Sequence, residues 1–212
     1  MAAAVIYGIK LSRNDVVIAS AKGEPGEHKD NVAASTNGRL NIIVPSTPYT
    51  GTPSVDFYDV PENLGLVIGF SSYQKTGGTE AGREALKAPV DTKDFVAQMG
   101  LVSAATAALV SGNTNRFLEL AWGDKFHQPR RARVRFYGDF DDNDFLGLQR
   151  KLYEEFGIAW DVSGAGPNMQ AKYNKDQYPK GIVEVISPVI VPWFGDRNIR
   201  MKLEERLIAK EG

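Results

Sequence analysis

Runs of apolar, β-branched residues in the first part of the chain predict strands. Residues 4–11 and 15–21 are two such runs with a polar break between them, which is typical of a β-hairpin. The stretch 22–38 is rich in Gly, Pro, Asn and charged residues and therefore predicts a long loop. Three more apolar runs predict further strands, at 39–44, 54–60 and 64–73.

Two segments show helical periodicity instead. In the first, about 91–111, Asp91 offers an acidic N-cap and apolar side chains recur three or four residues apart. In the second, 142–156, the same spacing ends at Gly157, a residue type at which helices often stop. The apolar stripes are Phe95, Met99, Val102 and Leu109 in the first segment, and Phe145, Leu148, Leu152 and Phe156 in the second. We predict that these are the two principal helices.

The middle of the chain predicts further strands and loops. Strands are expected at 116–122 and 131–137, and a second long loop at 163–180. Because the strands follow one another in hairpin-like runs, we predict an α+β fold, mainly an antiparallel sheet built from hairpins, with two principal helices and long loops. No repeat or linker divides the sequence, so residues 1–212 are expected to form a single domain.

The C-terminal part predicts a hairpin over 181–204 that projects from this domain. Its arms are the apolar runs 182–191 and 198–204. Trp193 and Phe194 would stand at its tip, where large aromatic side chains either fold back onto the core or contact a partner.

Composition and charge exclude several classes of function. The chain of 212 residues has no cysteine, which excludes disulfides, zinc–thiolate sites, iron–sulfur clusters and cysteine nucleophiles. A net charge of −1 counts against a duplex-DNA binder and against a protein held on an anionic membrane surface. No signal peptide and no membrane-spanning run is visible, so we expect a soluble, intracellular protein, in the cytoplasm or within an assembled particle.

A basic segment is the most distinctive feature of the sequence. If 131–135 is a strand, its three odd-numbered arginines share one face, close to Phe136 and Tyr137. Such a row fits the phosphates and unstacked bases of a nucleic acid, and it equally fits carboxylates of another subunit or of the same chain. The contact candidates in this segment are Lys125, Arg130, Arg131, Arg133 and Arg135.

An acidic cluster follows the basic segment directly. Its contact candidates are Asp139, Asp141 and Asp142, and Asp144 extends it. The cluster resembles the start of a calcium loop, but Asp144 and Arg150 stand where such a loop needs Gly and Glu. Capping of the helix that follows is therefore the favoured interpretation, and a divalent-ion site is the alternative. We predict no metal and no cofactor.

No catalytic constellation is readable. His28 and His127 both stand in predicted loops, without a partner at metal-ligand spacing. The Gly-rich stretches 76–79 and 163–167 lack the Gly-Lys-Ser/Thr of a phosphate-binding loop, so ordinary turns are favoured over anion sites.

These observations lead to one functional hypothesis and two alternatives. The first is a structural, self-assembling protein and not an enzyme: a subunit of a viral or phage virion, capsid or tail, whose partners are copies of itself. The adjacent basic and acidic segments would pair head to tail between copies. The first alternative is a nucleic-acid-binding module that uses the strand Arg130–Arg135, and the second is a metal-dependent enzyme that uses the Asp139–Asp144 cluster.

Overall fold

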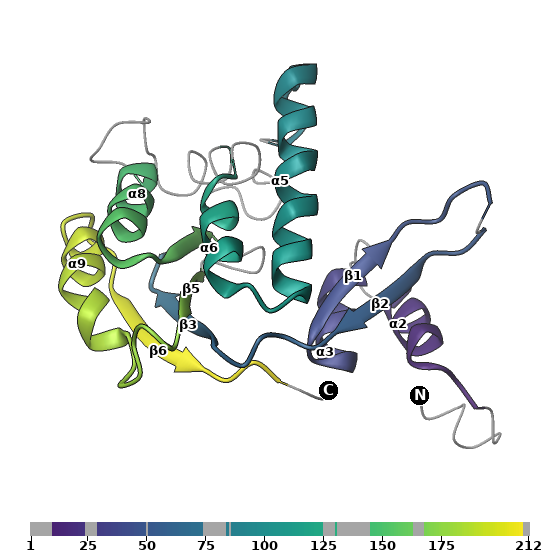
Figure 1. The fold of residues 1–212 in the computed structure, drawn as a ribbon, viewed down its shortest axis with the longest axis horizontal. Coiled ribbons are helices and arrows are strands. Elements are labelled where there is room, and N and C mark those ends of the chain that lie inside the picture. The colour runs from purple at the N-terminus through teal and green to yellow at the C-terminus, as the bar shows by residue number, and fades with distance from the viewer. Residues whose placement is uncertain are drawn as a thin grey trace. The chain divides into compact units, whose positions relative to one another are not determined.

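The computed structural model describes residues 10–23, 29–49, 51–73, 84, 86–124, 130, 145–162 and 168–209. The chain divides into two compact units, which are drawn in Figure 1. Unit 1 comprises Met1–Val60 and Ile208–Gly212, and unit 2 comprises Pro61–Leu207.

In its described residues, unit 1 contains two short helices and a two-stranded antiparallel sheet. The sheet pairs Ile42 with Asp56 at its centre. Val17, Ala33 and Val55 form a small core between helices and sheet. The elements are α2 (Arg13–Ala21), α3 (Lys29–Asn37), β1 (Leu40–Val44) and β2 (Ser54–Tyr58).

The predicted hairpin over 4–11 and 15–21 is wrong in its second arm, because residues 13–21 form α2. A capping box starts this helix: the Asp15 amide donates to the Ser12 hydroxyl, and the Ser12 amide donates to the Asp15 carboxylate. Burial of Val17 and Ala21, four residues apart, then favours a helix over the strand that the β-branched run suggests locally. Residues 4–9 of the first arm lie outside the described part of the chain.

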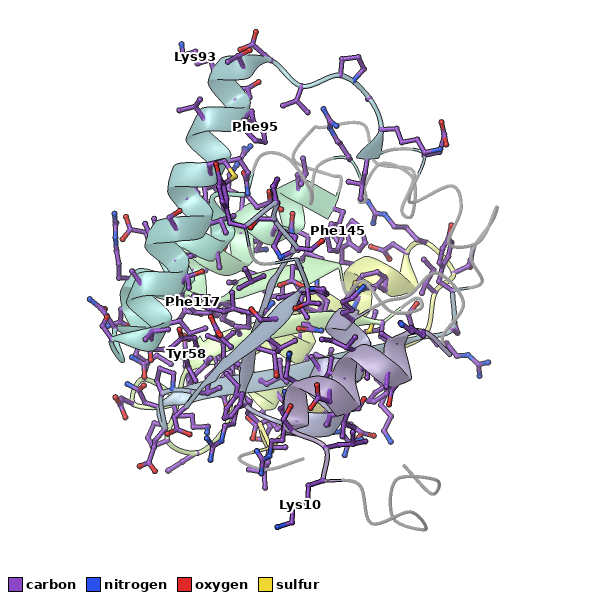
Figure 2. The ribbon with its side chains drawn as sticks, turned by 90° about the vertical axis from the view of Figure 1, so that its right-hand side faces the viewer. Lys10, Tyr58, Lys93, Phe95, Phe117 and Phe145 are labelled. Atoms are coloured by element: carbon purple, nitrogen blue, oxygen red, sulfur yellow. The ribbon has the colours of Figure 1, made fainter. Side chains whose placement is uncertain are left out.

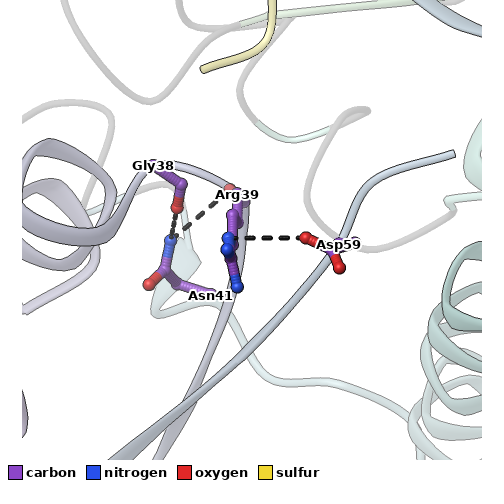
Figure 3. Close-up of polar contacts among 4 residues, drawn as sticks. All are labelled: Gly38, Arg39, Asn41 and Asp59. Carbon is purple, nitrogen blue, oxygen red and sulfur yellow. Dashed lines mark hydrogen bonds and ion pairs between the residues drawn. The ribbon is translucent and has the colours of Figure 1, made fainter. Parts of the chain in front are cut away.

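The predicted loop over 22–38 is likewise wrong at 29–37, which form α3. The chain turns from α3 into β1 through Gly38 and Arg39, which both adopt positive φ angles, 60° and 56°. Arg39 is not a glycine, so its conformation needs support from its surroundings. Figure 3 shows this support: the Asn41 amide group donates to the Gly38 carbonyl over 2.6 Å, and Arg39 Nε lies 3.4 Å from Asp59 Oδ1.

Unit 2 is built on a four-stranded antiparallel sheet with the strand order β4-β5-β3-β6. Helices connect β3 to β4 and β5 to β6, so the order along the chain is strand, helices, two strands, helix, strand. The strands are β3 (Leu64–Ser71), β4 (Ala159–Val162), β5 (Met169–Asn174) and β6 (Met201–Arg206). The helices whose residues are described are α5 (Thr92–Val110), α6 (Thr114–Trp122), α8 (Phe145–Phe156) and α9 (Val183–Gly195).

The main core lies between one face of this sheet and the helices α8 and α9 (Figure 1). Alternate strand residues point into it, because successive side chains of a strand face opposite sides. On the helices, buried side chains recur at helical spacing. The fully or almost fully buried core residues include Val67, Trp160, Met169 and Ala171 from the sheet, and Leu148, Leu152, Ile186, Ile190 and Phe194 from the helices.

Two glycines of β3 are required by this packing. A Cβ on Gly65 would overlap the ring of Tyr173, and a Cβ on Gly69 would lie 2.8 Å from Cη2 of Trp160. The rings of Tyr173 on β5 and Trp160 on β4 therefore lie against positions of β3 that have no side chain.

The fold is α+β with antiparallel sheets, as predicted, and the helices expected at 91–111 and 142–156 are α5 and α8. Asp91 accepts a hydrogen bond from Lys93 N as an N-cap, and Gly157 ends α8 with a φ of 66°. The description as a sheet built from hairpins is too narrow, since helices carry the chain from β3 to β4 and from β5 to β6.

Three local predictions in unit 2 are wrong. The expected strand at 116–122 is the helix α6, and the expected loop at 163–180 contains β5. The projecting hairpin over 181–204 is instead α9 followed by β6. Its Val- and Ile-rich run reads locally as a strand, but Ile186, Ile190 and Phe194 stand four residues apart and are all fully buried on one helix face. The strand expected at 131–137 lies outside the described residues.

In the described part of the chain, no helix is long and apolar enough to cross a membrane.

The core of unit 2 can be tested with a matched pair of leucines. Leu152 is fully buried on α8, whereas Leu207 is 92% exposed. We expect Leu152→Ala to lower the free energy of unfolding by about 2–5 kcal/mol, because the substitution removes buried methyl groups and leaves a cavity. Leu207→Ala should change it by less than about 0.5 kcal/mol. Urea unfolding followed by circular dichroism measures both values, and equal effects would contradict the packing described.

Candidate active site

Several strand ends meet at one end of the four-stranded sheet. Val162 at the end of β4 pairs with Met169 at the start of β5, and Gly69 near the end of β3 pairs with Met169 from the other side. Ser71 pairs with Met201 at the start of β6. The two Gly-rich stretches of the sequence, 76–79 and 163–167, lie outside the described residues.

A cavity of about 300 Å³ lies beside β4 in unit 2. Its walls are mostly apolar side chains of α5 and α6, and two carboxylates, Asp124 and Asp161, complete the lining. Asp124 follows α6, and Asp161 is the penultimate residue of β4. In Figure 2, Lys93 and Phe95 mark the N-terminal end of α5. The remaining lining residues are Gln98, Leu101, Val102, Ala105, Leu120 and Ala121.

Asp161 forms an ion pair with Lys172 of β5. Ala159 is the residue of β4 that pairs with Lys172, so the two charged side chains are diagonal neighbours on adjacent strands. They share the face of the sheet opposite to the core, because their neighbours Trp160 and Ala171 are buried on the core side. The side chains of Lys172 and Asp161 are only 21% and 22% exposed.

The environment of Lys172 changes its acidity. Burial lowers the pKa of Lys172 from 10.5 to about 8, because desolvation penalises the charged ammonium group. The pair thus places a largely desolvated cation behind one of the two carboxylates that line the cavity.

Arg130 lies against the segment that precedes α5. Its guanidinium group donates to three backbone carbonyls: Nη1 to those of Leu86 and Ala88 over 3.3 and 2.8 Å, and Nη2 to that of Pro89 over 3.0 Å. The planar array of N–H groups on arginine suits such multiple contacts. Arg130 therefore positions the chain just before the N-cap of α5.

The other predicted contact residues are distributed as follows. Phe194 is fully buried in the core, and Trp193 is half-buried beside it on α9, so neither stands at a hairpin tip. The remaining candidates, and both histidines, lie outside the described residues: His28, Lys125, His127, Arg131, Arg133, Arg135, Asp139, Asp141 and Asp142. Because Phe194 is buried, its side chain is not exposed on a surface that could contact a partner.

Sequence reasoning missed Asp124, Asp161 and Lys172. The available signal was Asp161, an acid inside an otherwise apolar run at 158–162, which places a charge on one face of a short strand. Lys172 could not be matched to it, because the pairing of β4 with β5 follows from the sheet register alone. Within the described ranges, no group of three or more His, Cys, Asp or Glu residues could hold a metal ion.

The cavity has the chemistry of a site for a small polar molecule. Apolar walls exclude water from an aliphatic part, and carboxylates accept hydrogen bonds from hydroxyl or ammonium groups.

The chain is similar in sequence to homoserine kinases. It matches none of the known protein-family models. It is 29% identical over 188 residues to the homoserine kinase of Caldicellulosiruptor saccharolyticus, covering 88% of this chain and 56% of the relative. It is also 29% identical over 176 residues to the homoserine kinase of Sulfurisphaera tokodaii, covering 79% of this chain and 52% of the relative. The chain thus spans little more than half the length of these curated relatives.

Solved structures share the fold. The homoserine kinase of Cytophaga hutchinsonii superposes on 99% of this chain and 62% of its own, with a TM-score of 0.73 and 22% identity. A putative homoserine kinase of Listeria monocytogenes covers all of this chain and 63% of its own, with a TM-score of 0.64 and 14% identity. The mevalonate pyrophosphate decarboxylase of Streptococcus pyogenes follows with a TM-score of 0.61 and 10% identity, over 99% of this chain and 62% of its own.

These findings overturn the functional hypothesis from the sequence. The expectation of a structural, self-assembling virion component that is not an enzyme is wrong, because the relatives and structural neighbours are enzymes that act on small molecules. The expected partners, copies of the chain itself and nucleic acid, are wrong for the same reason. Adjacent basic and acidic runs are common on ordinary protein surfaces, so they carried too little information to decide between these classes.

The ion pair gives a prediction of pH dependence. The pKa of Lys172 is about 8 in the folded protein, and a lysine in an unfolded chain has a pKa of about 10.4. Between these values the unfolded chain binds a proton that the folded chain does not, so the free energy of unfolding rises with pH. We expect the wild type to gain stability relative to Lys172→Met from about pH 8 to about pH 10. Urea titrations over this range measure the difference, with Lys93→Met as the exposed control; a constant difference would contradict the prediction.

Removal of the Arg130 side chain tests its contacts with the chain before α5. Arg130→Ala should lower the free energy of unfolding by about 1–3 kcal/mol and speed proteolysis near 86–91, because three carbonyls lose their donor. Arg130→Lys should restore only part of this loss, since an ammonium group cannot span all three carbonyls. The control is Arg116→Ala, which breaks an exposed pair with Glu119 and should cost less than about 1 kcal/mol.

Proposed function

We propose that this chain carries out part or all of a kinase reaction in which a phosphoryl group passes from a nucleoside triphosphate to the hydroxyl group of homoserine or a closely similar amino alcohol. The observation that carries this proposal is the match to homoserine kinases over 79–89% of the chain, at 27–29% identity. The fold similarity over almost the whole chain supports it independently.

The other structural neighbours agree with a nucleotide-dependent reaction on a small molecule. One is a phosphomevalonate kinase in complex with phosphomevalonate and AMPPNP, with a TM-score of 0.57 and 11% identity. Another, with a TM-score of 0.57 and 12% identity, is described in complex with MVAPP, AMPPCP and magnesium. Proteins of this fold therefore bind triphosphate analogues beside small phosphorylated substrates, which supports a reaction that uses a nucleoside triphosphate.

In the proposed reaction the substrate hydroxyl oxygen attacks the terminal phosphorus. The bond between that phosphorus and the bridging oxygen breaks, the nucleoside diphosphate leaves, and the hydroxyl proton passes to a carboxylate or to water. Such reactions depend on positioning and on electrostatic stabilisation more than on covalent chemistry. The cavity beside β4 contributes to positioning: its apolar walls hold the aliphatic chain, and Asp124 and Asp161 accept hydrogen bonds from the polar groups of the substrate.

Magnesium would accompany the nucleotide. The described residues fit a magnesium ion only partly: they contain no cluster of three acidic or histidine ligands, but Mg²⁺ on a nucleotide needs only one or two carboxylates besides phosphate oxygens and water. When bound, the ion would neutralise charge on the phosphates.

The test is an assay of the purified chain with ATP, magnesium and L-homoserine. Phosphorus NMR detects O-phosphohomoserine, and a coupled assay detects ADP. We expect homoserine-dependent formation of both products, and none with L-2-aminobutyrate, which lacks the hydroxyl group but should compete for the site. Calorimetric titration measures homoserine binding separately. Absence of both phosphoryl transfer and homoserine binding would overturn the proposal.

The role of the cavity has its own test. Asp161→Asn should lower kcat/KM for homoserine at least about tenfold, because a neutral amide binds a cationic or hydroxyl group more weakly than a carboxylate does. Asp56→Asn, on an exposed strand residue of unit 1, should leave kcat/KM unchanged. A normal kcat/KM for Asp161→Asn would remove this cavity from the site while leaving the proposed reaction intact.

A further inference from the structure

A second cavity lies in unit 2, away from the one beside β4. It is a groove of about 750 Å³ between α8 and α9, a size typical of small-molecule sites. These two helices cover the core face of the sheet, whereas Asp161 and Lys172 belong to the opposite face. Among the described residues, the groove and the cavity beside β4 therefore share no lining residue and border opposite faces of the sheet.

The lining of the groove follows from the helical repeat of α8. Leu148 and Leu152 face the core, which turns the intervening charged positions toward the groove and solvent. The C-terminal end of α9 adds charged residues from the other side. The groove is lined by three cations, Arg150, Lys151 and Arg197, and by three carboxylates, Glu154, Glu155 and Asp196. Lys151 and Glu155 form an exposed pair with each other, with 4.0 Å between Nζ and Oε1, so a ligand would compete with this weak contact.

Trp193 supplies an aromatic surface that is already held in place. Its ring makes edge contacts with Phe145 and Phe194, at centroid distances of 6.1 and 4.7 Å. The guanidinium carbon of Arg197 lies 3.6 Å from the centre of the Trp193 ring, and Arg197 Nη1 donates to the Trp193 carbonyl over 2.9 Å. An aromatic ring and a cation are thus fixed together before any ligand arrives, which lowers the entropic cost of binding.

Apolar side chains occupy the space between the charged groups. Val189 and Pro188 from α9 line the groove together with Trp193. A ligand with a single charge would meet like charges on part of this lining. A ligand with both charges and an apolar part would match all three kinds of surface.

We propose that this groove binds a small zwitterion with an apolar side chain, such as a free α-amino acid or a short peptide. The cations bind its carboxylate, the carboxylates bind its ammonium group, and the side chain packs on Trp193 and Val189. Binding here does not depend on the kinase reaction, so the groove can be tested even if that reaction is absent.

Tryptophan fluorescence gives a direct readout, because Trp193 lines the groove. The probes are L-leucine and L-leucyl-L-leucine, each titrated into the full chain. N-acetyl-L-leucine lacks the ammonium group and L-leucinamide lacks the carboxylate. We expect saturable binding of at least one zwitterion and affinities at least about tenfold lower for both singly charged analogues. Trp193→Phe should abolish the fluorescence change while calorimetry still detects binding.

The two ends of the ligand are tested separately. Arg197→Gln and Glu154→Gln should each weaken binding of the zwitterion about tenfold or more, since each loses a charge-assisted contact. Arg197→Lys keeps the charge and should bind better than Arg197→Gln. Lys93→Gln, an exposed lysine on α5, is the control and should bind normally. Thermal unfolding verifies that all variants are folded.

Binding of leucine alone supports a free amino acid as ligand, and binding of the dipeptide alone supports a peptide. The proposal is overturned if neither zwitterion binds saturably up to its solubility limit. It is also overturned if N-acetyl-L-leucine binds as well as leucine, or if folded Arg197→Gln and Glu154→Gln variants both bind normally.

Discussion

The burial of Trp160 in the core of unit 2 is the constraint on which the rest of this unit depends. Trp160 is 2% exposed, and the end of its ring lies against Gly69 of β3. Because strand side chains alternate, the same placement turns Asp161 to the opposite face, toward the cavity beside β4. A shift of register by one residue would bury the carboxylate and expose the indole, so the core and the candidate site are determined together.

Two side chains, Lys172 and Arg130, stabilise the candidate site. Lys172 stands behind Asp161 and reduces the cost of keeping a carboxylate in a poorly solvated place. Arg130 holds the backbone before α5, and α5 forms one wall of the cavity. Lys172 and Arg130 thus hold other groups in position. Positioning of this kind suits the proposed phosphoryl transfer, which depends on the alignment of substrate and phosphate.

The two faces of the sheet differ in their chemistry. On the core face, α8 and α9 bury apolar stripes and leave a charged groove with Trp193 between their outer surfaces. On the other face, the ion pair of Asp161 and Lys172 adjoins a smaller and more apolar cavity. A small α+β unit can thus carry two sites of different character, since each face of a sheet has its own set of side chains.

The sequence by itself determined the fold class and the elements with strong local signals, such as α5 with its Asp91 cap and α8 with its stop at Gly157. It did not determine α2 and α9, because Val- and Ile-rich runs suit strands locally and only burial of one helical face selects the helix. The pairing of Asp161 with Lys172 was decided by the tertiary structure alone. These residues come together through the register of two strands, and register is a property of the folded sheet rather than of either segment.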